Sequence, residues 1–267
     1  MSIPPILLVG CGRMGSAMLS GWREQGLASS VAVDPAAAAA EWAGADLTVA
    51  PDVGAVPEAF APAAVVFAVK PQNAAETLPL YRQYAGKAVF LSIMAGRTIA
   101  GMQALLGGEA AIVRAMPNTP AAVRQGVTVA CPGLGVDMPQ RALCERLLQA
   151  IGVVAWVEDE ALLDPVTAVS GSGPAYVFLL AELMEQAARE QGIPADLARL
   201  LARQTVSGSG ALLAASEEDA AALRIAVTSP GGTTERALAV LMDSDAWPAA
   251  LSKAIAAATV RSRELAG

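Results

Sequence analysis

Short apolar segments alternate with helix-type segments along the first half of the chain. Runs that are continuously apolar and rich in β-branched residues predict strands that are covered on both faces. Helical text lies between most of them, as at 14–25, which Gly26 closes, and at 72–84 and 139–150. This alternation predicts a doubly wound α/β domain with a parallel sheet. The predicted strands are 5–10, 30–34, 46–50, 64–70, 88–93, 111–116, 126–131 and 153–158.

The pattern changes at about residue 158, after which strand signals are absent. Residues 173–192 predict a helix, with Pro174 in its first turn and Gly192 beyond its end. Helical text resumes at 194–216 and, after an interruption, over about 235–265. We therefore predict an α/β domain over 1–158 and an all-helical domain over 159–267.

Composition narrows the class of protein. The chain of 267 residues is 54% hydrophobic and has a mean hydropathy of +0.47. No segment of about 18 residues lacks charges and turn signals as a spanning helix would, and the first residues lack a basic signal-peptide region. The net charge of −7, with acids and bases interspersed, argues against a nucleic-acid surface. We expect a cytoplasmic protein with neither a membrane nor a nucleic acid as partner.

The apolar helices of the second domain carry few charges for surface helices. We therefore expect a homodimer, in which these helices are buried against a second copy of the chain.

Histidine is absent from the sequence. Its absence excludes a Ser-His-Asp triad, a His-ligated metal and the commonest general acid or base. The three cysteines, Cys11, Cys131 and Cys144, have no metal-type spacing and are expected as small core or loop residues. The chemistry must therefore need little proton transfer from the protein, or obtain it from a hydroxyl, a lysine, a carboxyl group or water, and we expect no metal.

The segment VGCGRMG places Gly10, Gly12 and Gly15 at a predicted strand-to-helix turn. In a G-x-G-x-x-G loop, the first glycine permits the tight turn, the second lets the backbone approach a pyrophosphate, and the third lets helix and strand pack closely. The free N–H groups at the start of the helix favour phosphate. Dinucleotide binding is the prediction, and a glycine-rich turn that binds nothing is the alternative.

Asp34 ends the second predicted strand, 34 − 10 = 24 residues after Gly10. It either accepts hydrogen bonds from an adenosine ribose, which would favour NADH over NADPH, or serves as a helix N-cap. Arg13 approaches the pyrophosphate or is merely solvated. Lys70 either approaches the ribose or the phosphates, or it has no ligand role and Pro71 simply ends the strand. The segments 92–96 and 116–120, the latter containing Asn118, end the next two strands at the same edge.

The stretch VTSPGGTT, residues 227–234, interrupts helical text near the end of the chain. Pro230 fixes one dihedral angle, and Gly231 and Gly232 let backbone N–H groups converge on a carboxylate. Thr233 and Thr234, near the start of the next helix, are able to bond a small ligand. The alternative is a helix–turn–helix with a threonine N-cap.

Together these motifs resemble the pyrroline-5-carboxylate reductase family, which catalyses the final step of proline biosynthesis. The resemblance is carried by RAMPNTPAAVRQG (114–126), VTAVSGSGPAYVF (166–178) and VTSPGGTTERAL (227–238), and extends to VGCGRMG and AVKP. It implies a Rossmann domain, a helical dimerisation domain and a substrate site between them. It also implies hydride transfer from NADPH or NADH to the C=N carbon of a cyclic imine. For this reaction Thr233 and Thr234 are able to bond the carboxylate and the imine nitrogen, and we expect Thr234 to contact the nitrogen as the catalytic residue.

The resemblance also assigns residues to each ligand. The cofactor set, with Asp34 and Asn118 added from their positions, is Val9, Gly10, Cys11, Gly12, Arg13, Met14, Asp34, Ala68, Val69, Lys70, Pro71, Ile93, Met94, Ala95 and Asn118. The substrate set is Ser170, Gly171, Ser172, Gly173, Gly231, Gly232, Thr233 and Thr234.

Two departures separate this chain from the family pattern. Arg13 stands where the family often has Asn, and residues 219–227 replace a His-Pro-Gly-x-Leu-Lys-Asp element. Alternative functions are a reductase of a six-membered cyclic imine or a hydroxy acid, and a non-catalytic protein that binds a dinucleotide or proline. Hydroxy-acid dehydrogenases of this layout use a lysine in the helical domain, but residues 159–252 contain none.

Overall fold

The computed structural model describes residues 2–266, with side chains through 265. The chain forms two compact units, one of residues 2–171 with 258–266 and one of residues 172–257. The division therefore differs from the predicted boundary at 158/159. Residues 160–171 stay with the first unit because Leu163 is buried in its core and Glu160 bonds Arg114 and the backbone of Ile99.

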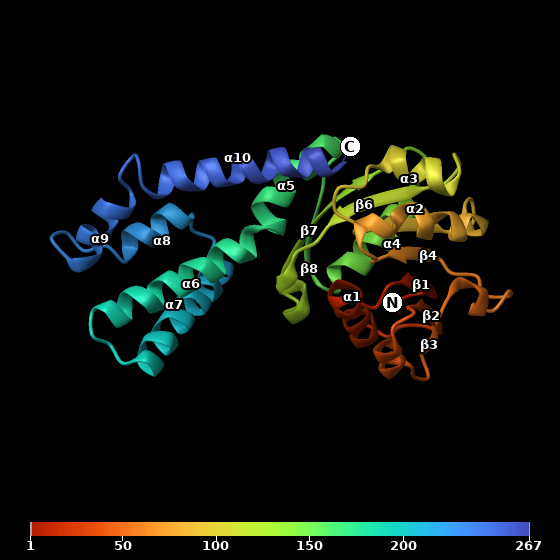
Figure 1. Ribbon diagram of the computed structural model, residues 1–267, viewed down its shortest axis with the longest axis horizontal. Helices are drawn as coiled ribbons and strands as arrows, with labels where there is room; N and C mark the ends of the chain where they lie inside the picture. The colour runs from red at the N-terminus through yellow and green to blue at the C-terminus, as the bar shows by residue number, and fades with distance from the viewer. Residues whose placement is uncertain (1, 267) are drawn as a thin grey trace. The chain divides into compact units, whose positions relative to one another are not determined.

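The first unit is built on an eight-stranded sheet, and all eight predicted strands are confirmed (Figure 1). The strand order is β3-β2-β1-β4-β5-β6-β7-β8. Because the chain leaves β1 toward β2 and later returns to β4, the switch point of this doubly wound sheet lies between β1 and β4. The strands are β1 (Ile6–Val9), β2 (Ser30–Val33), β3 (Leu47–Ala50), β4 (Ala64–Phe67), β5 (Val89–Ser92), β6 (Ile112–Met116), β7 (Gly126–Pro132) and β8 (Gly152–Trp156).

Each central strand sends alternate side chains to two cores. Leu8 and Val66 pack in one core with α1 (Arg13–Glu24) and α4 (Met138–Gln149). Leu7 and Val65 pack in the other with α3 (Ile99–Leu106) and the 3-10 helix η4 (Leu78–Tyr84). Burial on both faces explains why the strands are continuously apolar.

Two details of the first unit differ from the prediction. β7 runs antiparallel to β6, because the short connection between them cannot make the crossover that a parallel pair needs. The helix expected over 72–84 is mostly 3-10: η3 (Pro71–Asn73) and η4 flank the single turn α2 (Ala74–Thr77). Pro79, which cannot donate a backbone hydrogen bond, lies in the first turn of η4.

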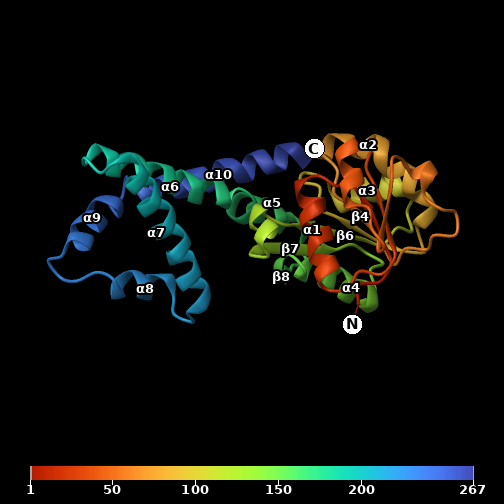
Figure 2. The same ribbon diagram turned by 90° about the horizontal axis from the view of Figure 1, so that it is seen from below.

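The second unit is helical throughout, as predicted. Its helices α6 (Gly173–Glu190) and α7 (Ala195–Ala215) pack against each other and lie side by side in Figure 1, whereas they diverge in the view of Figure 2. The single helix expected over 235–265 is two, α9 (Thr233–Leu241) and α10 (Trp247–Ala266), and the short α8 (Ala220–Ala226) precedes them. Residues 242–246 connect α9 to α10. In this connection Asp243 Oδ1 accepts a hydrogen bond from the backbone N of Asp245 and forms a turn.

Large apolar side chains are exposed along these helices, among them Phe178 at 66%, Leu200 at 60% and Val240 at 70%. One helical stretch, Glu160–Glu190, is long and apolar enough to cross a membrane by length and composition alone. The stretch contains Asp164, Pro165 and the turn-type segment SGSGP, so it does not contradict the expectation that every such run carries charges or turn signals.

Candidate functional site

The glycine loop after β1 has the geometry that its spacing predicts. Gly10 has a φ of +99°, and a Cβ there would lie 2.8 Å from the carbonyl oxygen of Ala68. A Cβ on Gly15 would lie 2.1 Å from the carbonyl oxygen of Gly10, so only glycine lets α1 approach the strand this closely. Gly10 therefore permits the turn, and Gly15, in the first turn of α1, permits the close packing of the helix against it.

Gly12 differs from its two partners in the loop. A Cβ at this position would meet no atom within 4 Å. It is also the N-cap of α1, and no side chain caps the helix there. An exposed helix N-terminus with open space above it suits a pyrophosphate, whose charge interacts favourably with the free N–H groups. The residues present fit a bound dinucleotide.

Asp34 is tied to this loop. Its Oδ2 accepts a hydrogen bond of 2.6 Å from the backbone N of Cys11, and its Oδ1 accepts one of 2.8 Å from Ala36 N. The helix-cap interpretation is wrong as stated, because the following 3-10 helix η1 (Ala37–Trp42) has Ala36 as its N-cap. Asp34 instead stabilises the glycine loop and leaves a carboxylate beside it.

Cys11 lies in the same loop with a protonated thiol. Partial burial, and then the nearby Asp34 carboxylate, raise its pKa to about 11. Burial raises the pKa of Cys131 to about 11 and of Cys144 to about 12. All three thiols are free. Cys144 and Cys131 are buried in the two cores and Cys11 is a loop residue, in agreement with the expectation of small core or loop residues.

The loops after β4 and β5 continue the edge at the switch point. Backbone hydrogen bonds join Ala68 N to Val9 O and Ile93 N to Phe67 O. Arg97 Nε donates to Pro71 O at 2.8 Å and thereby ties the two loops together. Four of the predicted cofactor segments, at 9–14, 34, 68–71 and 93–95, thus lie at the ends of β1, β2, β4 and β5, respectively, which are neighbours in the sheet. Lys70 and Arg13 are exposed cations at this edge.

Asn118 is 9% exposed at the end of β6. Its Nδ2 donates to Ser170 O at 3.1 Å, and its Oδ1 accepts from Val127 N at 3.0 Å. The side chain therefore joins the 116–120 loop to the SGSG segment and to β7, so cofactor contact by Asn118 stays a prediction.

The SGSG segment begins in an unusual helix. Residues Thr167–Gly171 form a π-helix, η7, between α5 (Leu163–Val166) and α6. The Ser170 hydroxyl donates to Val166 O at 3.0 Å. Ser170 and Gly171 belong to the first compact unit, and Ser172 and Gly173 to the second. Wide helical turns of this type are frequent at functional sites.

The 227–234 stretch is a tight turn that leads into α9. Gly231 has a φ of +71°, and Gly232 N donates to Ser229 O at 3.0 Å. The N-cap of α9 is Gly232 and no side chain caps it, so the threonine N-cap alternative is wrong. The N–H of Gly232 is used within the turn, whereas the N–H groups in the first turn of α9 have no partner within the helix.

Sequence reasoning missed Glu235. Its Oε2 accepts a hydrogen bond of 2.8 Å from Gly231 N. The available signal was a glutamate in the first turn of a predicted helix, four residues after a turn glycine. Such a glutamate commonly reaches back to a backbone N–H upstream.

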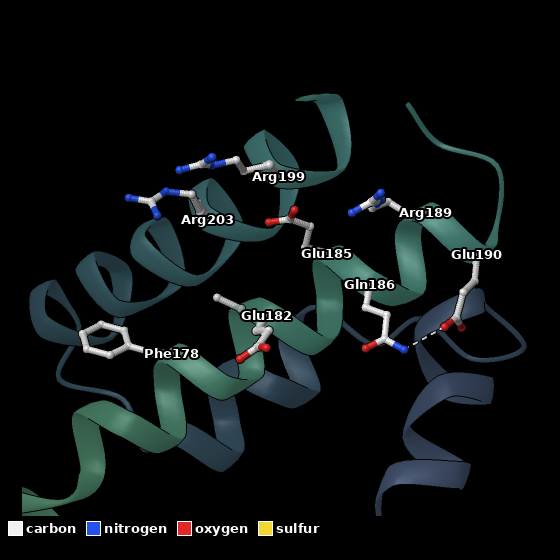
Figure 3. A pocket seen from close by; sticks show the side chains of 9 residues that line it. Phe178, Glu182, Glu185, Gln186, Arg189, Glu190, Arg199 and Arg203 are labelled. Carbon is white, nitrogen blue, oxygen red and sulfur yellow. Dashed lines mark hydrogen bonds between the residues drawn. The ribbon is translucent and has the colours of Figure 1, made fainter. Parts of the chain in front are cut away.

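A groove with a volume of about 840 Å³ lies over α6 and α7 (Figure 3). None of the predicted site residues lines it. Glutamate and arginine side chains both line it. The hydrogen bond drawn there joins Gln186 Nε2 to Glu190 Oε1 at 2.9 Å. In the described part of the chain, no group of His, Cys, Asp and Glu residues is arranged to hold a metal.

A doubly wound sheet with a G-x-G-x-x-G loop at its switch point defines the chain as a Rossmann-type dinucleotide-binding protein. Residues 5–96 match the family model of coenzyme F420-dependent NADP oxidoreductases, and residues 160–265 match that of pyrroline-5-carboxylate reductase dimerisation. The chain is 38% identical over 270 residues to pyrroline-5-carboxylate reductase from Pseudomonas aeruginosa, covering 100% of this chain and 98% of the relative. The chain belongs to the pyrroline-5-carboxylate reductase family.

Solved structures agree with this assignment. The pyrroline-5-carboxylate reductase of Coxiella burnetii is 31% identical with a TM-score of 0.89, covering 100% of both chains. The Plasmodium falciparum pyrroline carboxylate reductase with NADP bound is 26% identical with a TM-score of 0.82, covering 98% of both chains. The fold class is therefore confirmed. The match to a dimerisation domain supports self-association of the chain.

Proposed function

We propose that this protein reduces 1-pyrroline-5-carboxylate to L-proline with a nicotinamide dinucleotide as hydride donor. The observation that carries the proposal is the 231–234 turn. It already binds a carboxylate, that of Glu235, in a chain whose other unit keeps an intact dinucleotide loop. The substrate is a cyclic imine with one carboxylate. The carboxylate suits the 231–234 turn, and the imine is a group that a bound dinucleotide is able to reduce.

The reaction requires little proton transfer from the protein. A cyclic imine protonates far more readily than a carbonyl, so it reaches the site already activated, which agrees with the absence of histidine. The dinucleotide supplies the hydride when bound. The chain holds the pyrophosphate at Gly12 and the start of α1, and orients the imine through its carboxylate and nitrogen. Positioning of this kind contributes about 7–11 kcal/mol to catalysis in well-oriented systems.

In this proposal, different groups of the 231–234 turn bind the carboxylate and the nitrogen of the substrate. Gly231 N and the first-turn N–H groups of α9 bind the substrate carboxylate. Thr233 is exposed and Thr234 is half-buried at the start of the helix. We assign Thr233 to the carboxylate and Thr234 to the imine nitrogen. Ser170, Gly171, Ser172 and Gly173 remain the proposed second substrate segment.

The direct test follows NADH and NADPH oxidation separately with pyrroline-5-carboxylate and with its six-membered homologue. We expect turnover of the five-membered imine at least about tenfold more efficient in kcat/KM, because a pocket discriminates one methylene by about 1–3 kcal/mol. Preference for the six-membered ring would assign the chain a different imine. Cofactor binding without oxidation of either dinucleotide would contradict an enzymatic function.

We further propose a preference for NADH, because the Asp34 carboxylate beside the glycine loop repels a 2′-phosphate. Asp34→Asn keeps one oxygen acceptor for the loop and removes the charge. It should raise the NADPH-to-NADH ratio of kcat/KM by about fivefold, equivalent to ~1 kcal/mol of screened repulsion. Asp137→Asn is the matched control, because the Asp137 side chain also accepts a hydrogen bond from a backbone N–H, that of Gln140 at the start of α4. An unchanged ratio in Asp34→Asn would show that Asp34 only supports the loop.

We also propose that the second unit forms a homodimer through its exposed apolar side chains. Light scattering at micromolar concentration should give at least twice the chain mass of 27.1 kDa. The physical reason is that so large an exposed apolar surface is unfavourable in water. A monomeric mass with full activity would contradict this part of the proposal.

A further inference from the structure

The carboxylate of Glu235 lies where the proposed function places the carboxylate of the substrate. Glu235 is in the first turn of α9, and its Oε2 accepts the hydrogen bond of Gly231 N at 2.8 Å. Gly231 is the turn residue with a positive φ, two residues before α9 begins. Two carboxylates cannot both accept this N–H, and their charges repel each other.

We propose that Glu235 acts as an internal competitor that the substrate carboxylate must displace, and so sets the affinity of the site for carboxylates. This inference rests on the proposed function. A ligand without a carboxylate that displaces Glu235 breaks the bond between Glu235 and Gly231 N and forms no equivalent bond in its place. Glu235 therefore favours carboxylate-bearing imines over neutral ones, at the expense of absolute affinity.

The surroundings of Glu235 allow the displacement. Glu235 and Gly231 are both exposed, and a Cβ on Gly231 would meet no atom within 4 Å. None of the ion pairs among the described residues involves Glu235. The side chain is thus held at the turn by the Gly231 bond and by the positive end of the helix, and both of these attractions are also available to a substrate carboxylate.

The expected loss of substrate affinity follows from the fraction of molecules in which Gly231 N is not bonded to Glu235. Apparent affinity falls by the fraction of molecules in which the donor is available. If the Glu235 bond is formed in about two thirds to nine tenths of molecules, its removal tightens substrate binding about three- to tenfold.

Two variants separate the bond from the charge. Glu235→Gln keeps the length of the side chain, but it offers Gly231 N only a neutral and therefore weaker acceptor and removes the charge that repels a substrate carboxylate. Glu235→Asp keeps the charge but is one methylene too short to reach Gly231 N. The matched control is Asp196→Asn, which removes an exposed acid from the first turn of α7 in the same unit.

We expect Glu235→Gln to lower the KM for pyrroline-5-carboxylate about three- to tenfold, with kcat within about twofold and the NADH dissociation constant unchanged. Glu235→Asp should lower KM by a smaller factor, and Asp196→Asn should leave it unchanged. A helix cap alone would lower the melting temperature without lowering KM. An unchanged or raised KM in both Glu235 variants would overturn the proposal.

A binding measurement keeps this inference separate from the proposed function. Pyrrole-2-carboxylate, a planar five-membered ring with the same carboxylate, is titrated calorimetrically into the wild type and into Glu235→Gln. Tighter binding to the variant supports the competition even if no imine is reduced, in which case the proposed function alone fails. Equal or weaker binding to the variant contradicts the competition even if the enzyme is active.

Discussion

Replacing Gly12 with valine should abolish productive binding of the dinucleotide while leaving the fold intact. A Cβ at Gly12 meets no protein atom within 4 Å, so we expect the free protein to accept a side chain at this exposed position. The same space is where a pyrophosphate must approach the start of α1. Loss of about two hydrogen bonds to a charged group, about 3 kcal/mol or more, should weaken NADH binding at least about a hundredfold. Fluorescence titration of NADH gives the affinity, and thermal unfolding gives the stability.

Gly15→Ala is the matched control from the same loop. Its added methyl would lie 2.1 Å from the carbonyl oxygen of Gly10, so the turn between β1 and α1 has to open. We expect this variant to lower the melting temperature clearly, whereas Gly12→Val does not. If Gly12→Val bound NADH as the wild type does, the pyrophosphate would not lie over Gly12 and the assignment of the loop would be wrong.

The contrast between these two glycines shows which features the sequence predicts well. The roles of Gly10, Gly12 and Gly15 follow from local geometry, because a strand, a tight turn and a helix within a few residues leave few arrangements. The eight strands were predictable for a similar reason. Burial on both faces makes each strand a short, continuously apolar run, and that signal is contained within the segment itself.

Features that depend on distant partners were not predictable from local pattern. The tie between Asp34 and Cys11 N joins positions 23 residues apart. The bridge from Asn118 to Ser170 spans 52 residues. The division between the compact units depends on contacts such as Ser262 Oγ donating to Asp164 Oδ1 at 2.7 Å, which returns the end of α10 to the first unit. The antiparallel direction of β7, in contrast, was predictable from the sequence, because the connection between β6 and β7 is too short for a crossover.

Thr234 carries the second large expected effect, because its hydroxyl is the group that we assign to the reacting nitrogen. During hydride transfer the imine nitrogen gains the character of a protonated amine, so a hydrogen bond to it strengthens toward the transition state. An interaction that is stronger in the transition state than in the ground state raises kcat. Thr233, assigned to the carboxylate, makes a contact that is equal in both states and therefore acts on KM.

Thr234→Ala should lower kcat and kcat/KM together by about 1–3 kcal/mol, or about fivefold to about 150-fold. Thr234→Ser should retain most of the activity, because it keeps the hydroxyl and loses only a methyl group. Thr233→Ala should mainly raise KM. NADH binding should be unchanged in all three variants, because the dinucleotide loop belongs to the other compact unit. Steady-state kinetics gives these values, and melting temperatures exclude unfolding as the cause, since neither threonine caps α9 through its side chain. A wild-type kcat in Thr234→Ala would mean that the imine receives its proton from solvent without help from this hydroxyl.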